Sequence, residues 1–216
     1  APSASLASLP DARMAFVTFY FRERMSPLVK CLNLSIALWS AYPLVVLHDN
    51  ATLVDGIYPY HAHVDELSAR VRPRGQVRVH PQGRAHAPGR RLFEWKYYQE
   101  TFNRKFLAWT LYEFDRIVII DADTYLRRHV DSLFTLPLLA PIAAVPSCSN
   151  STFNGGVLVA AQSLVEARAL LSLKASKPLC ERHITDQSLL NTRYAGRLQL
   201  HPRAYNYVGH HFAFKY

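Results

Sequence analysis

The stretch Ile117-Val-Ile-Ile-Asp-Ala-Asp123 joins a fully apolar run to two carboxylates one residue apart. Four branched apolar residues in a row predict a strand buried on both faces, as in a parallel sheet covered by helices. Burying the charges that follow is costly unless they meet solvent or a cation. Carboxylate oxygens suit Mn²⁺ or Mg²⁺, which keep coordination positions for substrate phosphates. We therefore expect Asp121 and Asp123 to bind a divalent metal, the alternative being that they cap the following turn.

Nearer the amino terminus, the chain predicts a strand, a helix and a second strand. Residues 15–20 are rich in β-branched and aromatic types, and Ser26-Pro27 is typical of a helix start, with Ser26 as N-cap. Apolar residues recur at helical spacing as far as Trp39, and Leu44-Val-Val-Leu47 predicts the second strand. Such a βαβ unit predicts parallel strands that bind ligands beyond their carboxyl ends.

The remaining segments extend this pattern. Helices are expected at residues 100–114, 163–173 and 186–191, and a strand at residues 157–160. The preceding Phe153-Asn-Gly-Gly156 predicts a turn with positive φ. The predicted fold class is α/β, a single Rossmann-like domain with a mostly parallel mixed sheet flanked by helices.

The composition favours one globular domain with an acidic partner. The 216 residues are half apolar and carry a net charge of +9. No apolar run approaches the roughly 20 residues that a membrane-spanning helix needs. Seven arginines lie between Arg70 and Arg91 among prolines and glycines, which is typical of a solvated loop. Because this segment lacks interleaved aromatic residues and a reading helix, nucleic-acid binding is the less favoured alternative.

Cysteines and glycosylation sequons bear on the cellular compartment. Three cysteines without close pairing indicate neither a zinc site nor a disulfide framework. Sequons begin at Asn33, Asn50 and Asn150, more than the about one expected by chance. They favour the Golgi or secretory lumen, with a cytoplasmic location as the alternative.

The chain resembles the glycogenin-type glycosyltransferases, the family eight retaining enzymes. The resemblance centres on residues 103–124 and continues in order through most of residues 15–206. The matching blocks are Ala15-Phe-Val-Thr18, Ile117-Val-Ile-Ile-Asp-Ala-Asp-Thr124, Val130-Asp-Ser-Leu-Phe134, Phe153-Asn-Gly-Gly156 and Asp186-Gln-Ser-Leu-Leu-Asn191. It implies a GT-A fold and metal-dependent, retaining transfer of a sugar from a UDP-sugar to a hydroxyl of a glycan or protein.

The resemblance also implies roles for individual residues. It places manganese on Asp121 and Asp123, and Lys105 at the donor phosphates or sugar, although Lys105 also fits an ordinary solvated helix lysine. Asp186 and Gln187 match the pair beside the anomeric carbon, with an N-cap role as the alternative for Asp186. Positions expected to contact the donor are Thr18, Phe19, Ala122, Asn154, Gly155 and Gly156.

Two departures from the family pattern leave alternatives open. The family completes its metal site with a histidine in a later motif, for which His210, His211 or a residue beyond Tyr216 are candidates; His211 is our choice. Ser147 stands near a family aspartate that contacts the sugar, so the donor sugar is open. A catalytically silent homologue that binds a nucleotide sugar or glycan is the rival function. We expect residues 1–12 to be a flexible segment and residues 13–216 the catalytic domain, truncated if the third ligand lies beyond Tyr216.

Overall fold

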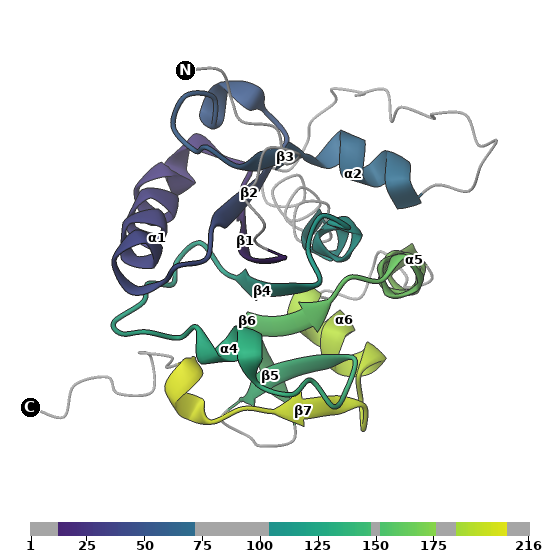
Figure 1. Cartoon of the computed structure of the whole chain (residues 1–216). Coiled ribbons are helices and arrows are strands. Elements are labelled where there is room, and N and C mark those ends of the chain that lie inside the picture. The colour runs from purple at the N-terminus through teal and green to yellow at the C-terminus, as the bar shows by residue number, and fades with distance from the viewer. Residues whose placement is uncertain (1–12, 72–103, 148–151, 176–184, 207–216) are drawn as a thin grey trace, which may run out of the picture.

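In the part of the chain that the structure describes, seven strands form one mixed sheet in the order β3-β2-β1-β4-β6-β5-β7 (Figure 1). The computed structural model describes residues 13–71, 104–147, 152–175 and 185–206. Only β6 runs against its neighbours, pairing antiparallel with both β4 and β5, while the other pairs are parallel. The strand bounds are β1 Met14–Tyr20, β2 Leu44–His48, β3 His61–His63, β4 Arg116–Ile120, β5 Ile142–Pro146, β6 Phe153–Ala161 and β7 Leu198–Leu200.

Helices cover both faces of this sheet (Figure 1). The predicted βαβ unit is confirmed, because α1 connects β1 to the parallel strand β2. The α-helices are α1 Ser26–Trp39, α2 Val64–Val71, α4 Ser132–Thr135, α5 Leu164–Ala175 and α6 Asp186–Arg193. The 3₁₀ helices are η2 Glu23–Met25, η3 Ala51–Leu53, η4 Arg104–Thr110 and η5 Arg203–Tyr205. The predicted fold class, an α/β domain with a mostly parallel mixed sheet, is confirmed.

Alternating side chains of the central strands build two apolar cores. From β4, Ile117 and Ile119 enter the core under α2, η4, α5 and α6. Val118 and Ile120 enter the opposite core, under α1 and α4. A strand that is apolar on both faces is therefore the centre of the sheet, as its sequence predicts. The strand ends at Ile120, and Asp121 follows directly.

Three local predictions are wrong in detail. The helix predicted for residues 100–114 is a 3₁₀ helix that ends at Thr110, residues 100–103 lying outside the described part. The Phe153–Gly156 segment is the start of β6 and not a turn, and positive φ among the described glycines occurs at Gly56 and Gly196. Ser26 is the first residue of α1, with Met25 as its N-cap.

Other predictions fall on parts that the structure leaves undescribed. Most of the arginine-rich segment, residues 1–12 and the candidate ligands His210 and His211 lie outside the described residues. Within the described part, none of the helices has the length and apolar character that crossing a bilayer requires.

Candidate active site

Lys105 joins three segments that are far apart in the sequence. Its ammonium donates to Asp121 Oδ1 at 2.8 Å, to Asp186 Oδ2 at 2.9 Å and to the Gly155 carbonyl at 2.7 Å. The lysine side chain is only 3% exposed, so the alternative of an ordinary solvated lysine is wrong. An ammonium has three protons, and here each has an acceptor. Lys105 therefore ties the ends of β4 and α6 to β6.

The local structure of η4 explains why a lysine can be held in the interior. Phe106 and Trp109, three residues apart on one face of the same short helix, are fully buried in the core, with ring centroids 6.5 Å apart. The Trp109 carbonyl also accepts from Ser163 N, 3.0 Å away, at the start of α5. With these anchors, η4 packs against the sheet along its whole length. The energy of burying the aromatic rings holds Lys105 at the carboxyl edge.

The site carries more negative than positive charge. Burial acts to lower the pKa of the Lys105 ammonium, but attraction to Asp121 and Asp186 outweighs it and the net shift is upward. Desolvation raises the pKa of Asp121, and repulsion from Asp186 and Asp123 adds to it, against the attraction of Lys105. Three carboxylates against one ammonium leave an excess that a further cation would neutralise.

The two aspartates after β4 fit a divalent cation. Among the described residues nothing hydrogen-bonds to Asp121 Oδ2 or to either oxygen of the exposed Asp123. Such hard oxygen ligands match Mg²⁺ or Mn²⁺, with phosphates and water completing the shell. Within the described ranges no group of three ligating side chains converges, and His211, the predicted third ligand, lies outside them. The predicted metal site stays a prediction.

Gly156 is required by close packing at the start of β6. A Cβ placed there would lie 2.9 Å from Asn154 Oδ1 and 3.4 Å from Asp121 Oδ2. Asn154 Oδ1 accepts from Gly156 N at 2.8 Å and from Asn206 Nδ2 at 2.7 Å. The glycine therefore lets Asn154 and Asp121 approach each other at the strand end, a reason unrelated to φ.

The first turn of α6 is bonded to the same strand. Gln187 Oε1 accepts from Gly155 N at 3.1 Å. One turn later, Asn191 accepts from Phe153 N at 2.8 Å and donates to the Phe153 carbonyl at 3.0 Å. The N-cap of α6 is Thr185, which forms a capping box with Ser188, so the N-cap role for Asp186 is wrong. Asp186 is left to face Lys105.

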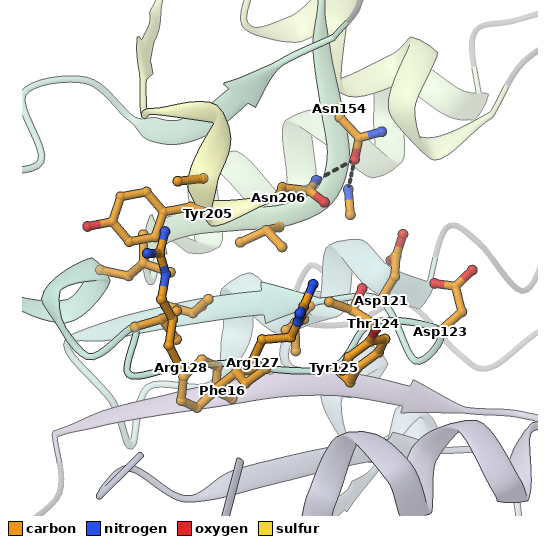
Figure 2. Close-up of a pocket in the computed structure, with 18 residues that line it drawn as sticks. Phe16, Asp121, Asp123, Thr124, Tyr125, Arg127, Arg128, Asn154, Tyr205 and Asn206 are labelled. Atoms are coloured by element: carbon orange, nitrogen blue, oxygen red, sulfur yellow. Dashed lines mark hydrogen bonds between the residues drawn. The ribbon is translucent and has the colours of Figure 1, made fainter. Parts of the chain in front are cut away.

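A cavity of about 950 Å³ opens beside Asp121 on the α1 and α4 side of the sheet (Figure 2). Its floor is made of apolar side chains from β1, β4 and β6, and its walls come from the loop after β4 and from η5. The lining residues are Phe16, Val118, Ile120, Asp121, Asp123, Thr124, Tyr125, Leu126, Arg127, Arg128, Val130, Leu133, Asn154, Gly156, Val157, Ala204, Tyr205 and Asn206. This size is at the upper end of small-molecule sites, about 300–1,000 Å³.

Curated proteins with similar sequences are glycosyltransferases. The chain is 34% identical to glycogenin-1 of Mus musculus over 94 residues, which is 43% of this chain and 26% of that protein. It is 37% identical to UDP-glucuronate:xylan alpha-glucuronosyltransferase 1 of Arabidopsis thaliana over 67 residues, 31% of this chain and 8% of that protein. No family model matches the sequence.

Solved glycosyltransferase structures share the fold. Apo GlyE of Streptococcus pneumoniae superposes with a TM-score of 0.60 at 15% identity, covering 89% of this chain and 46% of that one. The galactosyltransferase LgtC in complex with donor and acceptor sugar analogues gives 0.53 at 15% identity, covering 94% and 80%. The chain is therefore similar in sequence to glycogenin-like glycosyltransferases and shares the GT-A fold. It spans less than a third of the two curated relatives and about half of GlyE.

In this glycogenin-like domain, most of the predicted site residues meet at one sheet edge. Lys105, Asp121 and Asp186 are in direct contact, and Gly155, Gly156, Asn154 and Gln187 adjoin them. Three predicted donor contacts do not present their side chains there. Thr18, Phe19 and Ala122 are buried, the last two within the apolar cores. These three residues could therefore contact a donor through their backbone atoms and not through their side chains.

Several residues that the structure brings to the site of this glycogenin-like domain were not predicted from the sequence. Asn191 and Asn206 bond to β6, and each is a polar residue inside a block that matched the family. Arg127 and Arg128 line the cavity four and five residues after Asp123. The sequence feature that could have identified them is a pair of adjacent arginines after the metal motif. Spacing alone does not distinguish such a pair from residues of a solvated turn.

Proposed function

We propose that this domain transfers a sugar from a UDP-sugar to a hydroxyl acceptor, with retention of anomeric configuration and with the help of Mn²⁺ or Mg²⁺. The observation that carries the proposal is the buried Lys105, which bridges Asp121 to Asp186 at 2.8 and 2.9 Å. Such a buried, charged cluster is costly to fold and is typical of functional sites. The glycosyltransferase relatives and the shared GT-A fold support the same reaction class.

Asp121 and Asp123 would hold the metal, which when bound supplies positive charge for the departing diphosphate. Asp121 keeps Oδ2 for this role while Oδ1 accepts from Lys105. In the described geometry, Lys105 has no proton left to donate to the diphosphate. We infer that Lys105 positions the two carboxylates and contributes its charge through space.

Asp186 and Gln187 would act on the sugar. Lys105 binds one oxygen of Asp186, which leaves Oδ1 to stabilise positive charge developing at the anomeric carbon. Gln187 uses its carbonyl on Gly155 N, which leaves its amide N–H groups for a sugar hydroxyl. Both side chains are held by the first turn of α6, so the sugar would meet groups that are already oriented.

A panel of UDP-sugars tests the proposal. The purified domain is incubated with UDP-glucose, UDP-galactose, UDP-glucuronate and UDP-xylose, with and without Mn²⁺, and both released UDP and the thermal midpoint are measured. We expect metal-dependent stabilisation by the correct donor, because a ligand of the folded state raises its stability, and slow release of UDP by hydrolysis.

The variant Asp123→Asn should reduce UDP release by about 100-fold or more, since it removes one proposed metal ligand. Asp115→Asn is the matched control at the other end of β4, where the carboxylate pairs with Arg13 on the surface. Stabilisation without UDP release or transfer in any arm would indicate the catalytically silent homologue. Neither binding nor release with any donor would overturn the proposal.

A further inference from the structure

The cavity beside Asp121 has a second charged end that the proposed donor site does not use. Arg127 and Arg128 both line it, and among the described residues neither has an ion pair or a hydrogen bond. Figure 2 shows the two side chains extending from the loop after Asp123 toward the wall that carries Tyr205 and Asn206. Two unpaired guanidinium groups on one cavity favour an anionic ligand there.

The nearby carboxylates are already engaged or belong to the metal site. Asp131, a few residues along the same loop, accepts from Ser40 Oγ and from Ala41 N. Asp121 accepts from Lys105 at 2.8 Å. No described carboxylate therefore neutralises the arginines, and a ligand that enters the cavity would have to do so.

The arginines also lie apart from the groups assigned to the donor sugar. Lys105, Asp186 and Gln187 are not among the residues that line the cavity, although the predicted donor contacts Asn154 and Gly156 line the end that it shares with the metal site. The two sites share a wall, which is made of Asp121 and the start of β6. A molecule in the cavity would thus adjoin the donor sugar while its far end contacts the arginines. Such a position would suit an acceptor.

Two aromatic side chains of the cavity suit a sugar ring, Tyr205 beside Arg128 and Tyr125 beside Thr124 (Figure 2). Tyr205 is fixed by its hydroxyl, 2.8 Å from Ser132 Oγ, and by its ring, whose centroid is 5.8 Å from that of His201. Tyr125 lines the same cavity and is exposed. An aromatic wall with a few polar groups is the usual composition of a site for a small organic ligand.

We propose that Arg127 and Arg128 bind an oxyanion carried by the acceptor sugar, so that the domain selects an anionic glycan. The inference rests on the proposed transferase function and deepens it by naming the acceptor class. Because the guanidinium group is planar and donates in pairs, a carboxylate of a hexuronic acid matches it best, and a sulfate is the other source of the same chemistry.

A matched set of small glycosides tests this without any turnover. Binding of p-nitrophenyl β-glucuronide, p-nitrophenyl β-glucoside and a 6-sulfated p-nitrophenyl glucoside is measured by ligand-observed NMR, in the presence of UDP and Mn²⁺. The native domain should bind the glucuronide at least about tenfold more tightly than the glucoside, as a charge-assisted bidentate contact implies. Preference for the sulfated compound over the glucuronide would assign the oxyanion to sulfate.

The double variant Arg127→Gln/Arg128→Gln should remove the preference and leave the glucoside affinity unchanged. Lys30→Gln/Arg168→Gln, which removes two exposed charges from α1 and α5, is the control and should keep it. The inference is overturned if the native domain binds all three glycosides equally, or if the preference survives in the arginine variant. Loss of UDP stabilisation in that variant would also overturn it, because the arginines would then serve the donor. Failure of the native domain to bind UDP at all would count against the proposed function alone.

Discussion

The two ends of β4 carry similar charged residues, but these residues differ in whether each has a partner of its own. At the amino end, Asp115 pairs with Arg13 at 2.6 Å on the surface, and Arg116 donates to the carbonyls of Phe134 and Leu136 at 2.7 and 2.6 Å. Every charged group there has a partner of its own. The Arg116 contacts join β4 to the α4 segment, and the charged groups at this end need no additional ligand.

At the carboxyl end, the carboxylates outnumber their cationic partners. Asp121 and Asp186 share one buried lysine, and Asp123 has no described partner. Asp121 lies six positions after Asp115, yet only Asp121 belongs to the cluster around the buried Lys105, which has excess negative charge. The comparison indicates that the amino end serves stability and the carboxyl end serves binding, at a cost in stability.

Removing the shared cation should have the largest effect. Lys105→Met leaves Asp121 and Asp186 facing each other without compensation, so we expect the free energy of unfolding in urea to fall by about 3 kcal/mol. UDP release should fall by roughly 100-fold or more as the carboxylates lose their positions.

Two further variants sharpen the Lys105 experiment. Lys30→Met, on the exposed face of α1, is the control and should change neither quantity. Adding Asp186→Asn to Lys105→Met should restore part of the stability but none of the activity. A Lys105→Met protein as stable as the native one would contradict the comparison between the two ends.

Two neighbouring glycines provide the next test. In Gly156→Ala, the new Cβ would lie 2.9 Å from Asn154 Oδ1, so the Asn154 to Asn206 contact must shift and Asp121 with it. A displacement of this size should slow UDP release roughly tenfold or more. Gly155→Ala is the internal control, because its Cβ would make an ordinary 3.5 Å contact with Gln187. Equal rates in the two variants would show that Asn154 and Asp121 need not approach so closely.

A smaller effect should appear at His48, at the carboxyl end of β2. Burial, and then repulsion from His61 and His63, lowers the pKa of His48 from 6.5 to about 4. Because the folded-state pKa is below the unfolded value, the folded state binds fewer protons, and stability is lost as the pH falls from about 6.5 toward 4. Between pH 7 and pH 5 this amounts to about 2 kcal/mol.

Thermal or urea unfolding across that range measures the effect. The neighbours facing His48 are His61, whose Nδ1 is 3.0 Å from His48 Nε2, and His63, while Asp55 lies 3.6 Å from His61. His48→Gln should flatten the pH dependence, and His129→Gln, at an exposed position, should leave it as it is. A native protein equally stable at pH 5 and pH 7 would contradict the prediction.

The smallest effect belongs to the amino end of β4. Arg13→Ala removes an ion pair whose side chains are 75% and 52% exposed, so the free energy of unfolding should change by about 1 kcal/mol or less. UDP release should be unaffected. A loss of activity in this variant would mean that the two ends of β4 are coupled, against the division drawn above.

Much of the fold could be predicted because it depends on local patterns. The apolar strand at residues 117–120 and the helix starting near Ser26 follow from composition and spacing, and both agree with the structure within one residue. The start of β6 was mistaken for a turn, since Asn-Gly-Gly has turn chemistry by itself. Pairing of Phe153 and Asn154 with β5 overrides that preference.

Most residues of the candidate site could be predicted from the sequence, but the contacts between them could not. The resemblance named Lys105 and Asp186, but spacing could not tell that one ammonium would serve both carboxylates. Arg127 and Arg128 were not singled out, because adjacent arginines after a turn are ordinary surface residues until a cavity is known to lie beside them.

The sequence by itself determined that an apolar central strand ends in two carboxylates, since hydrophobic runs and charge placement are properties of consecutive residues. Only the tertiary structure decided what meets those carboxylates. Lys105 lies 16 residues from Asp121 and 81 residues from Asp186 in the chain, yet contacts both. The physical reason is that aromatic burial in η4 and the bonding of α6 to β6 set these distances, and neither depends on residues that are neighbours in the sequence.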